Sequence, residues 1–206
     1  RTFRFERDRQ RWIARRGLLR QLLGRYLEVN PAELRFVYGP RGKPALPAPE
    51  APVFNLSHSG GIALFAISAA ASVRLGVDVE LIRSDLAHLP LAQRYFSPAE
   101  QAALQALPKS QQLAAFFRCW TRKEAFVKAL GEGLSVPLDS FDVSLSSAEA
   151  QLLAWRHPAA AQTACTLFDL EPAPGFAAAL AVIGAGEWRL ACWQLPVSEQ
   201  AAGGEG

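Results

Sequence analysis

The spacing of apolar residues predicts two long helices in this chain. In the segment 7–28 the large apolar residues recur at helical intervals; they are Trp12, Leu19, Leu22, Leu23 and Tyr26. The dipeptide Asn30-Pro31 ends this pattern. A second segment, 110–130, shows the same spacing and is followed by Gly131, a residue that suits the end of a helix.

Short apolar runs predict strands after each helix. The first helix is followed by runs at 34–38, 53–56, 62–68 and 73–79, and the second by runs at 141–145, 152–155, 163–170, 176–183 and 188–195. The stretch 86–90 is expected to be irregular, and the small polar tail 201–206 to be disordered. This order predicts an α+β fold of two similar halves, residues 1–84 and 85–206, each a long helix packed on a small antiparallel sheet.

Composition narrows the class of protein. Half of the 206 residues are hydrophobic, which is enough for a buried core, yet no apolar run is long enough to cross a membrane. The three cysteines, Cys119, Cys165 and Cys192, form no CxxC pair, so we expect neither disulfides nor a zinc site and predict a reducing, cytoplasmic location. The first 50 residues hold 12 of the 22 Lys and Arg residues but 5 of the 19 Asp and Glu residues. This basic end predicts a polyanionic ligand.

The segment that ends in Glu80 carries the first candidate for chemistry. Asp78 and Glu80 are two residues apart, so strand geometry puts both carboxylates on one side while Val77 and Val79 face the other. Two carboxylates held this close repel each other unless a cation lies between them, and oxygen ligands suit magnesium. The alternative is an ordinary solvated strand end. Motifs typical of phosphate loops, dinucleotide sites, zincins and serine hydrolases are absent from the sequence.

The second predicted helix carries another charged set. Glu124 and Lys128 are four residues apart and share a face, and Lys123 is adjacent. A surface ion pair, which would contribute about 0.3 kcal/mol, is the simplest explanation. Trp120 and Phe116 lie on the same stripe, however, so we expect protein to cover part of this surface. A third carboxylate beside two lysines fits a site for magnesium and pyrophosphate.

Two further segments offer donors to an anion. Ser57 and His58 end a predicted strand just before Gly60 and Gly61, where backbone amides can approach a phosphate and the side chains can donate to it. The alternative is a histidine with a structural role. The turn 41–44 contributes an arginine and a lysine, which suit a phosphate or an adenine; the alternative is an ordinary basic turn.

Five short blocks follow one another from residue 42 to residue 128. They are GKP (42–44), FNLSHS (54–59), GVDVE (76–80), FSPAE (96–100) and WTRKEAFVK (120–128). In order and spacing they resemble the successive signatures of the Sfp-type 4′-phosphopantetheinyl transferases. That family is a pseudo-dimer of two α+β halves with coenzyme A bound in the cleft between them, so the resemblance implies the same arrangement here.

The resemblance also implies roles for individual residues. Magnesium would be held by Asp78, Glu80 and Glu124. Coenzyme A would be bound by Arg11, Lys43, Pro44, Ser57, His58, Lys123 and Lys128, with Lys43 and Pro44 at the adenosine end. Arg11, or alternatively Arg15 or Arg16, would lie near the 3′-phosphate. Glu124, as general base, and Lys128, beside the departing phosphate, would be the catalytic residues, with a metal-bound water as the alternative base.

The implied reaction moves the 4′-phosphopantetheine arm of coenzyme A to a serine of an apo acyl or peptidyl carrier protein and releases adenosine 3′,5′-bisphosphate. A magnesium-dependent hydrolase of nucleotides or coenzyme A would use the same carboxylates. A nucleic-acid-binding domain could be built on the basic first helix, but it leaves the carboxylates unexplained. We therefore expect a monomeric enzyme that binds neither nucleic acid nor membrane. Leu134, in the segment 131–138, is expected to meet the carrier protein, or alternatively to anchor a loop in the core.

Overall fold

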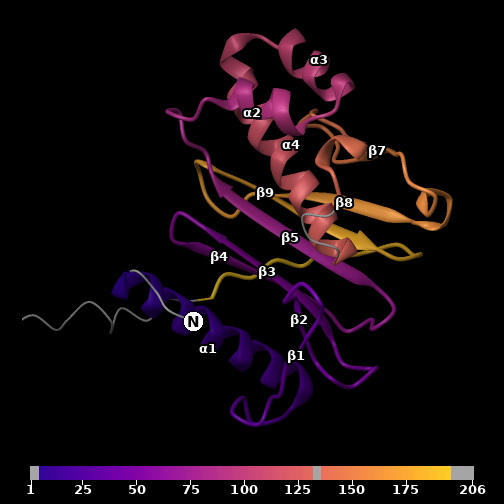
Figure 1. Ribbon diagram of the computed structural model, residues 1–206. Coiled ribbons are helices and arrows are strands. Elements are labelled where there is room, and N and C mark those ends of the chain that lie inside the picture. Colours follow the sequence, from indigo (N-terminus) through magenta and orange to yellow (C-terminus); the bar gives the residue numbers. More distant parts are fainter. Residues whose placement is uncertain (1–4, 132–135, 196–206) are drawn as a thin grey trace, which may run out of the picture.

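The computed structural model describes residues 5–131 and 136–195 (Figure 1). In its first half a long helix packs on a strand hairpin. The elements are α1 (Glu6–Leu27), the short hairpin of β1 (Val37–Tyr38) and β2 (Pro44–Ala45), and the longer hairpin of β3 (Val53–Ser59) and β4 (Ile62–Ser68). Leu19 and Leu23 form the buried face of α1 and belong to one apolar cluster with Phe54 of β3. The helix predicted at 7–28 is thus confirmed, and it packs through Leu19 and Leu23, two of the apolar residues that predicted it.

The second half is built around another long helix. Its elements are α2 (His88–Tyr95), α3 (Pro98–Ala106), α4 (Lys109–Leu130), β6 (Phe141–Val143), β7 (Leu152–Trp155), β8 (Cys165–Leu170) and β9 (Phe176–Ile183), with 3-10 turns at Leu138–Ser140 and Ala160–Gln162. The strand β5 (Arg74–Leu81) joins β9 and β8 in an antiparallel sheet of order β5-β9-β8. Helix α4 lies across β5 and β9 (Figure 1). The α+β class is therefore confirmed, with one long helix on a small antiparallel sheet in each half.

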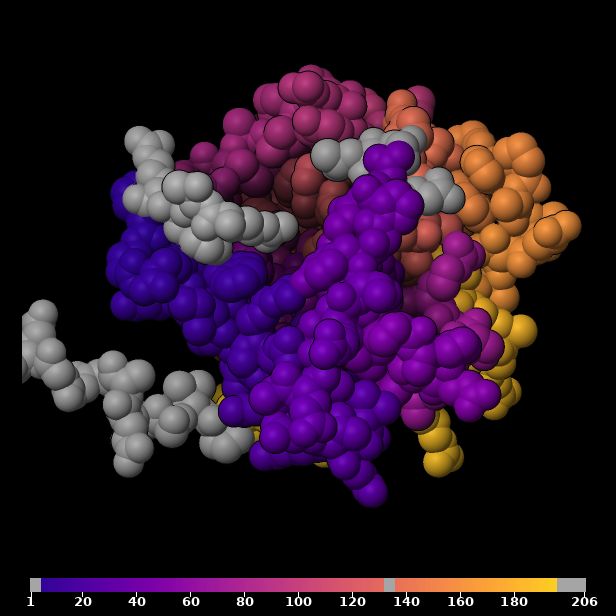
Figure 2. All heavy atoms as spheres, turned by 60° about the horizontal axis from the view of Figure 1, so that its bottom comes forward, coloured from indigo at the N-terminus to yellow at the C-terminus, as the bar shows by residue number. Residues whose placement is uncertain are grey.

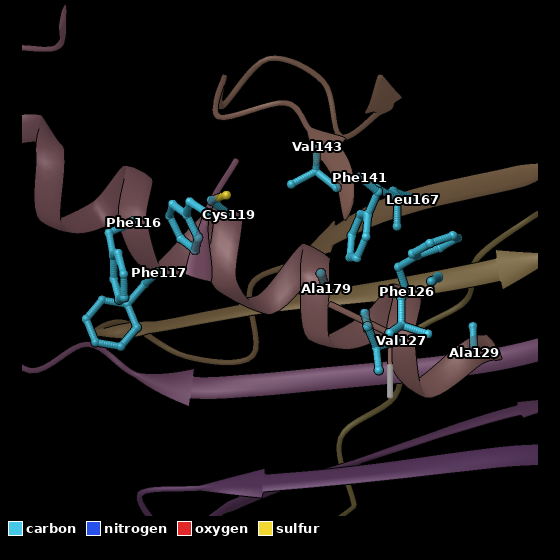
Figure 3. Packing of buried hydrophobic residues seen from close by; sticks show 14 of the residues in the cluster. Phe116, Phe117, Cys119, Phe126, Val127, Ala129, Phe141, Val143, Leu167 and Ala179 are labelled. Carbon is cyan, nitrogen blue, oxygen red and sulfur yellow. The ribbon is translucent and has the colours of Figure 1, made fainter. Parts of the chain in front are cut away.

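The main core lies between α4 and the elements that it covers. Phe126 of α4 packs against Phe141 of β6, with ring centroids 4.8 Å apart, and Leu167 of β8 belongs to the same cluster (Figure 3). Nearer the start of α4, Phe116 stacks on Phe96 with centroids 5.2 Å apart. Full burial of one such side chain contributes about 2 kcal/mol. This core fixes α4 over the sheet.

Two charged side chains of α4, Arg122 and Lys123, are completely buried. Lys123 Nζ lies 2.8 Å from Glu100 Oε2 of α3 and donates to the carbonyl oxygens of Leu138 and Phe141, both at 2.7 Å. Arg122 donates to a carboxylate of β8 and to backbone carbonyls of the loop after β6. Removing one partner of a buried pair costs about 3–5 kcal/mol, so these charges hold α3 and the chain after α4 in place.

Two predicted strands differ from the structure. The strand predicted at 34–38 is reduced to β1, and the run 188–195 forms no strand among the described residues. Trp193 in that run is 79% exposed, and an alternating pattern forms a strand only where a partner strand accepts its hydrogen bonds.

Two short helices also differ from the prediction. The stretch 86–90, expected to be irregular, leads into α2. Helix α3 was not predicted, although Ser97 and Glu100 form a capping box at its start. The tail 201–206 lies outside the described residues.

The sheet crosses the boundary expected between residues 84 and 85. β5 precedes that boundary, yet it pairs with β9 along its whole length, from Arg74 opposite Ile183 to Leu81 opposite Phe176. Figure 2 shows the first half, indigo to purple, lying across the magenta and orange second half. The division into 1–84 and 85–206 stays a prediction, with β5 as the strand on which both parts meet.

No helix of the described chain is both long and apolar enough to cross a membrane.

One close contact sets the distance between α4 and β5. A Cβ added at Gly76 would lie 2.0 Å from the oxygen of Ala125 and 2.3 Å from the nitrogen of Ala129, both backbone atoms of α4. Backbone atoms cannot rotate away as a side chain can, so only glycine allows this approach. Strand alternation puts Gly76 on the same face of β5 as Asp78 and Glu80. The contact therefore also sets how far these carboxylates lie from α4.

We predict that Gly76→Ala lowers the free energy of unfolding by about 3 kcal/mol, because α4 must move away from β5 to admit the methyl group. Urea unfolding followed by circular dichroism measures the change. Gly17→Ala is the matched control: Gly17 lies within α1 and an added Cβ has no neighbour within 4 Å. There alanine should stabilise the protein by about 0.5–1 kcal/mol. Wild-type stability of Gly76→Ala would contradict the close packing.

Candidate active site

Three of the predicted motifs meet in one open cavity of about 410 Å³ between β3, β5 and α4. Its lining residues are Leu56, Ser57 and His58 of β3, Asp78 and Glu80 of β5, and Trp120, Glu124 and Lys128 of α4. These positions are far apart in the sequence and are brought together because β5 contacts both β3 and α4. Six predicted site residues therefore share one cavity.

The carboxylates of Asp78, Glu80 and Glu124 form the acidic part of the cavity. Asp78 is 3% exposed, and the two glutamates are half-buried. Burial raises the pKa of all three, and the charge of Asp78 raises the pKa of both glutamates further. Val77 and Val79 are buried on the opposite face of β5, as the strand alternation predicts. The arrangement therefore favours a bound cation.

Lys128 supplies one cation to this cluster. Its Nζ lies 2.6 Å from Asp78 Oδ1, 3.0 Å from Ser57 Oγ and 3.2 Å from the carbonyl oxygen of Val77. The other oxygen of Asp78, Oδ2, is buried and has no hydrogen-bond donor among the described residues. Leaving such an atom without a partner costs about 1–3 kcal/mol, so Asp78 Oδ2 is available to a further positive group.

The donor set fits magnesium in kind and in charge. Three carboxylates, one of them with a buried and unpartnered oxygen, are the ligands that this ion prefers. As the side chains stand, no three His, Cys, Asp or Glu residues in the described parts of the chain are arranged to hold a metal ion. The ammonium of Lys128 lies against Asp78 instead.

His58 lies on the face of β3 that turns toward α1, together with Leu56, which packs in the α1 cluster. Burial lowers the pKa of His58, and the charges of Arg15 and Lys128 lower it further. Burial also lowers the pKa of Arg15, as does its neighbour Arg11. Arg11 and Arg15 of α1 and Lys128 of the cavity therefore place positive charge on both sides of His58, and this arrangement suits an anion.

Lys43 lies beside the cavity without lining it. Its Nζ donates to the carbonyl oxygens of Leu75, at 2.8 Å, and of Lys128, at 2.6 Å. Burial lowers the pKa of Lys43 to about 8. Pro44 pairs with Tyr38 in the β1–β2 hairpin. The ammonium of Lys43 thus ties this hairpin to β5 and to the end of α4.

Lys123 is a predicted cofactor-binding residue that the structure places inside the core. It is completely buried and paired with Glu100 of α3. Consecutive residues of a helix are about 100° apart around its axis, so Lys123 does not share the cavity-facing side of α4 with Glu124. We therefore assign Lys123 a structural role and leave it out of the proposed site.

Two polar residues of the FNLSHS block, to which the sequence assigned no role, support the site from β3 without lining the cavity. Asn55 Oδ1 accepts a hydrogen bond from the N–H of Val77 at 2.8 Å, and Ser59 Oγ donates to Glu80 Oε2 at 2.9 Å. With Ser57 they occupy alternate positions of β3, so all three face β5. Alternate polar residues in an otherwise apolar strand are the sequence signal by which they could be found.

Proteins with similar sequences are 4′-phosphopantetheinyl transferases. Residues 74–181 match the family described as the 4′-phosphopantetheinyl transferase superfamily. The 4′-phosphopantetheinyl transferase HetI of a Nostoc species is 39% identical over 196 residues, which cover 93% of this chain and 78% of HetI. Sfp of Bacillus subtilis is 36% identical over 145 residues, or 70% of this chain and 62% of Sfp. AcpT of Escherichia coli K12 is 42% identical over 148 residues, or 70% of this chain and 71% of AcpT.

The matched region includes the carboxylates of β5 and α4, and the alignment with HetI extends over most of the chain. The family expected from the five sequence blocks is thereby confirmed. The similarity supports a transferase rather than a hydrolase or a nucleic-acid-binding domain. This chain is an enzyme that belongs to the 4′-phosphopantetheinyl transferase superfamily.

Proposed function

We propose that the protein transfers the phosphopantetheine arm of coenzyme A to a serine of an apo acyl or peptidyl carrier protein. The observation that carries this proposal is the meeting of three carboxylates and Lys128 in an open cavity beside His58. The similar proteins are named as transferases of this arm, which favours transfer over hydrolysis of coenzyme A. The products are the holo carrier protein and adenosine 3′,5′-bisphosphate.

The reaction forms one phosphorus–oxygen bond and breaks another. The serine Oγ attacks the β-phosphorus of coenzyme A, and the bond from this phosphorus to the bridging oxygen of the α-phosphate breaks. The serine proton passes to a base. Glu124 is our candidate, because burial and the charge of Asp78 raise its pKa and so strengthen it as a base. A water molecule beside Glu124 is the alternative.

Positive groups offset the charge of the departing phosphate. Lys128 is proposed to do so, since its ammonium already lies in the cavity. Ser57 and His58 are proposed to donate to phosphate oxygens. Magnesium would be held by Asp78, Glu80 and Glu124. When bound, the ion offsets the negative charge of the pyrophosphate.

Basic residues of the first half are proposed to bind the other end of coenzyme A. Arg15 of α1 is the candidate for the 3′-phosphate, because it is the arginine whose charge acts on His58. The charge of Arg11 acts on Arg15, so Arg11 would add to the positive charge near the 3′-phosphate. Lys43 and Pro44 would meet the adenosine. Arg11 and Arg15 lie on α1, and Lys43 and Pro44 lie in the β1–β2 hairpin.

We further infer a monomeric enzyme in the cytoplasm. Cys119, Cys165 and Cys192 are free thiols, and free thiols persist in a reducing compartment. A single chain supplies both halves and the whole cavity lining, so the site needs no second copy. Leu134, the residue expected to meet the carrier protein, lies outside the described residues.

Asp78→Asn should lower the transfer rate at least about a hundredfold while the fold persists, because a proposed metal ligand loses its charge but keeps its shape. The protein is incubated with magnesium, coenzyme A and a panel of apo carrier proteins, and the products are weighed for the mass of the arm. Asp85→Asn is the matched control, since Asp85 is exposed and does not line the cavity. If the variant transferred the arm at the wild-type rate with magnesium limiting, Asp78 would be excluded as a magnesium ligand. A wild type that modifies no carrier would refute the transfer itself.

Glu124→Gln should make the metal-free protein more stable than wild type at pH 7. The folded-state pKa of Glu124 is raised, so its charged form opposes folding. This cost is absent below the unfolded pKa and grows as the pH rises through the folded pKa. Thermal melting in a chelator over a pH series should therefore show the two proteins converging below about pH 4. A variant less stable than wild type at pH 7 would contradict the burial and the repulsion by Asp78 to which we attribute the raised pKa of Glu124.

Arg15→Gln should raise the Michaelis constant for coenzyme A about tenfold but change that for 3′-dephospho-coenzyme A much less, because the lost bond is to a phosphate that the analogue lacks. Initial rates with both compounds and one carrier protein measure the effect. Arg25→Gln, in the last turn of the same helix, is the control. Equal effects on the two compounds would rule out the 3′-phosphate as the partner of Arg15.

A further inference from the structure

Side chains, rather than a backbone ladder, join β3 to β5. The two strands are neighbours but belong to different sheets. Asn55 accepts from the N–H of Val77, and Ser57 Oγ donates to Asp78 Oδ1 at 2.9 Å. Ser59 continues the series two residues further along β3. These alternate residues therefore hold β3 to the strand that carries Asp78 and Glu80.

Ser59 makes two hydrogen bonds to β5 at once. The N–H of Leu81 lies 3.1 Å from Ser59 Oγ, which itself lies 2.9 Å from Glu80 Oε2. A backbone N–H can only donate, so Oγ accepts that bond and its single proton is left for Glu80. The backbone of β5 thus orients the hydroxyl, and the hydroxyl orients the carboxylate of the preceding residue.

Glu80 needs such an anchor more than Asp78 does. Asp78 is buried and is held by both Lys128 and Ser57. Glu80 is half-buried near the end of β5, and its longer side chain has one more rotatable bond to fix. Among the described residues, its only side-chain hydrogen bond comes from Ser59. Without that bond the carboxylate is free to turn toward solvent.

We propose that Ser59 is a positioning residue that holds Glu80 in the orientation in which it serves as a magnesium ligand. Ser59 does not line the cavity, so it acts through Glu80 rather than on coenzyme A. The inference rests on the proposed function, because it presupposes the magnesium site. Partners of metal-binding side chains commonly contribute about ten- to a hundredfold in metal affinity, and a neutral hydroxyl belongs at the lower end.

The test measures metal binding directly. Manganese chloride is titrated into the full chain in the presence of saturating coenzyme A, and free Mn²⁺ is followed by electron paramagnetic resonance. Ser59→Ala should raise the dissociation constant for Mn²⁺ about tenfold, and Ser59→Thr, which keeps the hydroxyl, should restore it to within about twofold of wild type. Ser68→Ala is the matched control: among the described residues, the one hydrogen bond of the Ser68 side chain comes from the N–H of Ala70 at the end of the same hairpin, and its loss should leave the constant unchanged.

The kinetics separate positioning from a general structural effect. In Ser59→Ala the magnesium concentration for half-maximal transfer should rise by the same factor, while the Michaelis constant for coenzyme A at saturating magnesium stays within about twofold. If wild type binds Mn²⁺ and Ser59→Ala binds it equally well, the inference is overturned and the proposed function stands. If wild type binds none, the magnesium site itself is refuted, and the role of Ser59 with it. Loss of coenzyme A binding and thermal stability, unrescued by Thr, would also overturn a positioning role.

Discussion

The approach of α4 to β5 at Gly76 is the contact on which the rest of the structure depends. Gly76 meets Ala125 and Ala129, both fully buried, so two backbones touch with almost no side chain between them. The charged residues of the cavity flank this contact, because Glu124 and Lys128 each precede one of the two alanines. Any larger residue at the contact would separate the helix from the carboxylates of β5.

The rest of the core opposes the cost of burying three carboxylates in one cavity. Three carboxylates with raised pKa values are held together, although each would be better solvated apart. Two features fix α4 beside these carboxylates: the packing of Phe126 against Phe141, and the buried pair of Lys123 with Glu100. Such sites lower the stability of the fold, because buried negative charge is unfavourable. The same negative charge attracts a cation or a positively charged group of a substrate.

The contact between β3 and β5 forms one wall of the open cavity, which α4 completes. A backbone ladder would have continued one sheet across the molecule. Here side chains of β3 reach across instead, and the hydroxyls of Ser57 and Ser59 bond directly to Asp78 and Glu80. The same hydrogen bonds therefore hold β3 to β5 and orient the acidic groups of β5.

The sequence by itself determined the α+β class, both long helices, most strands, the family and the acidic residues of the cavity, because helical spacing, strand alternation and ordered motifs are local properties. It failed where the outcome depends on a distant partner: the run 188–195 has strand spacing but no strand beside it, and Lys123 adjoins Glu124 in the motif but lies on a buried side of α4. Only the tertiary structure decided that Ser59 meets Glu80, 21 residues away. That contact depends on how β3 lies against β5, and no local pattern of residues encodes the packing of one strand on another.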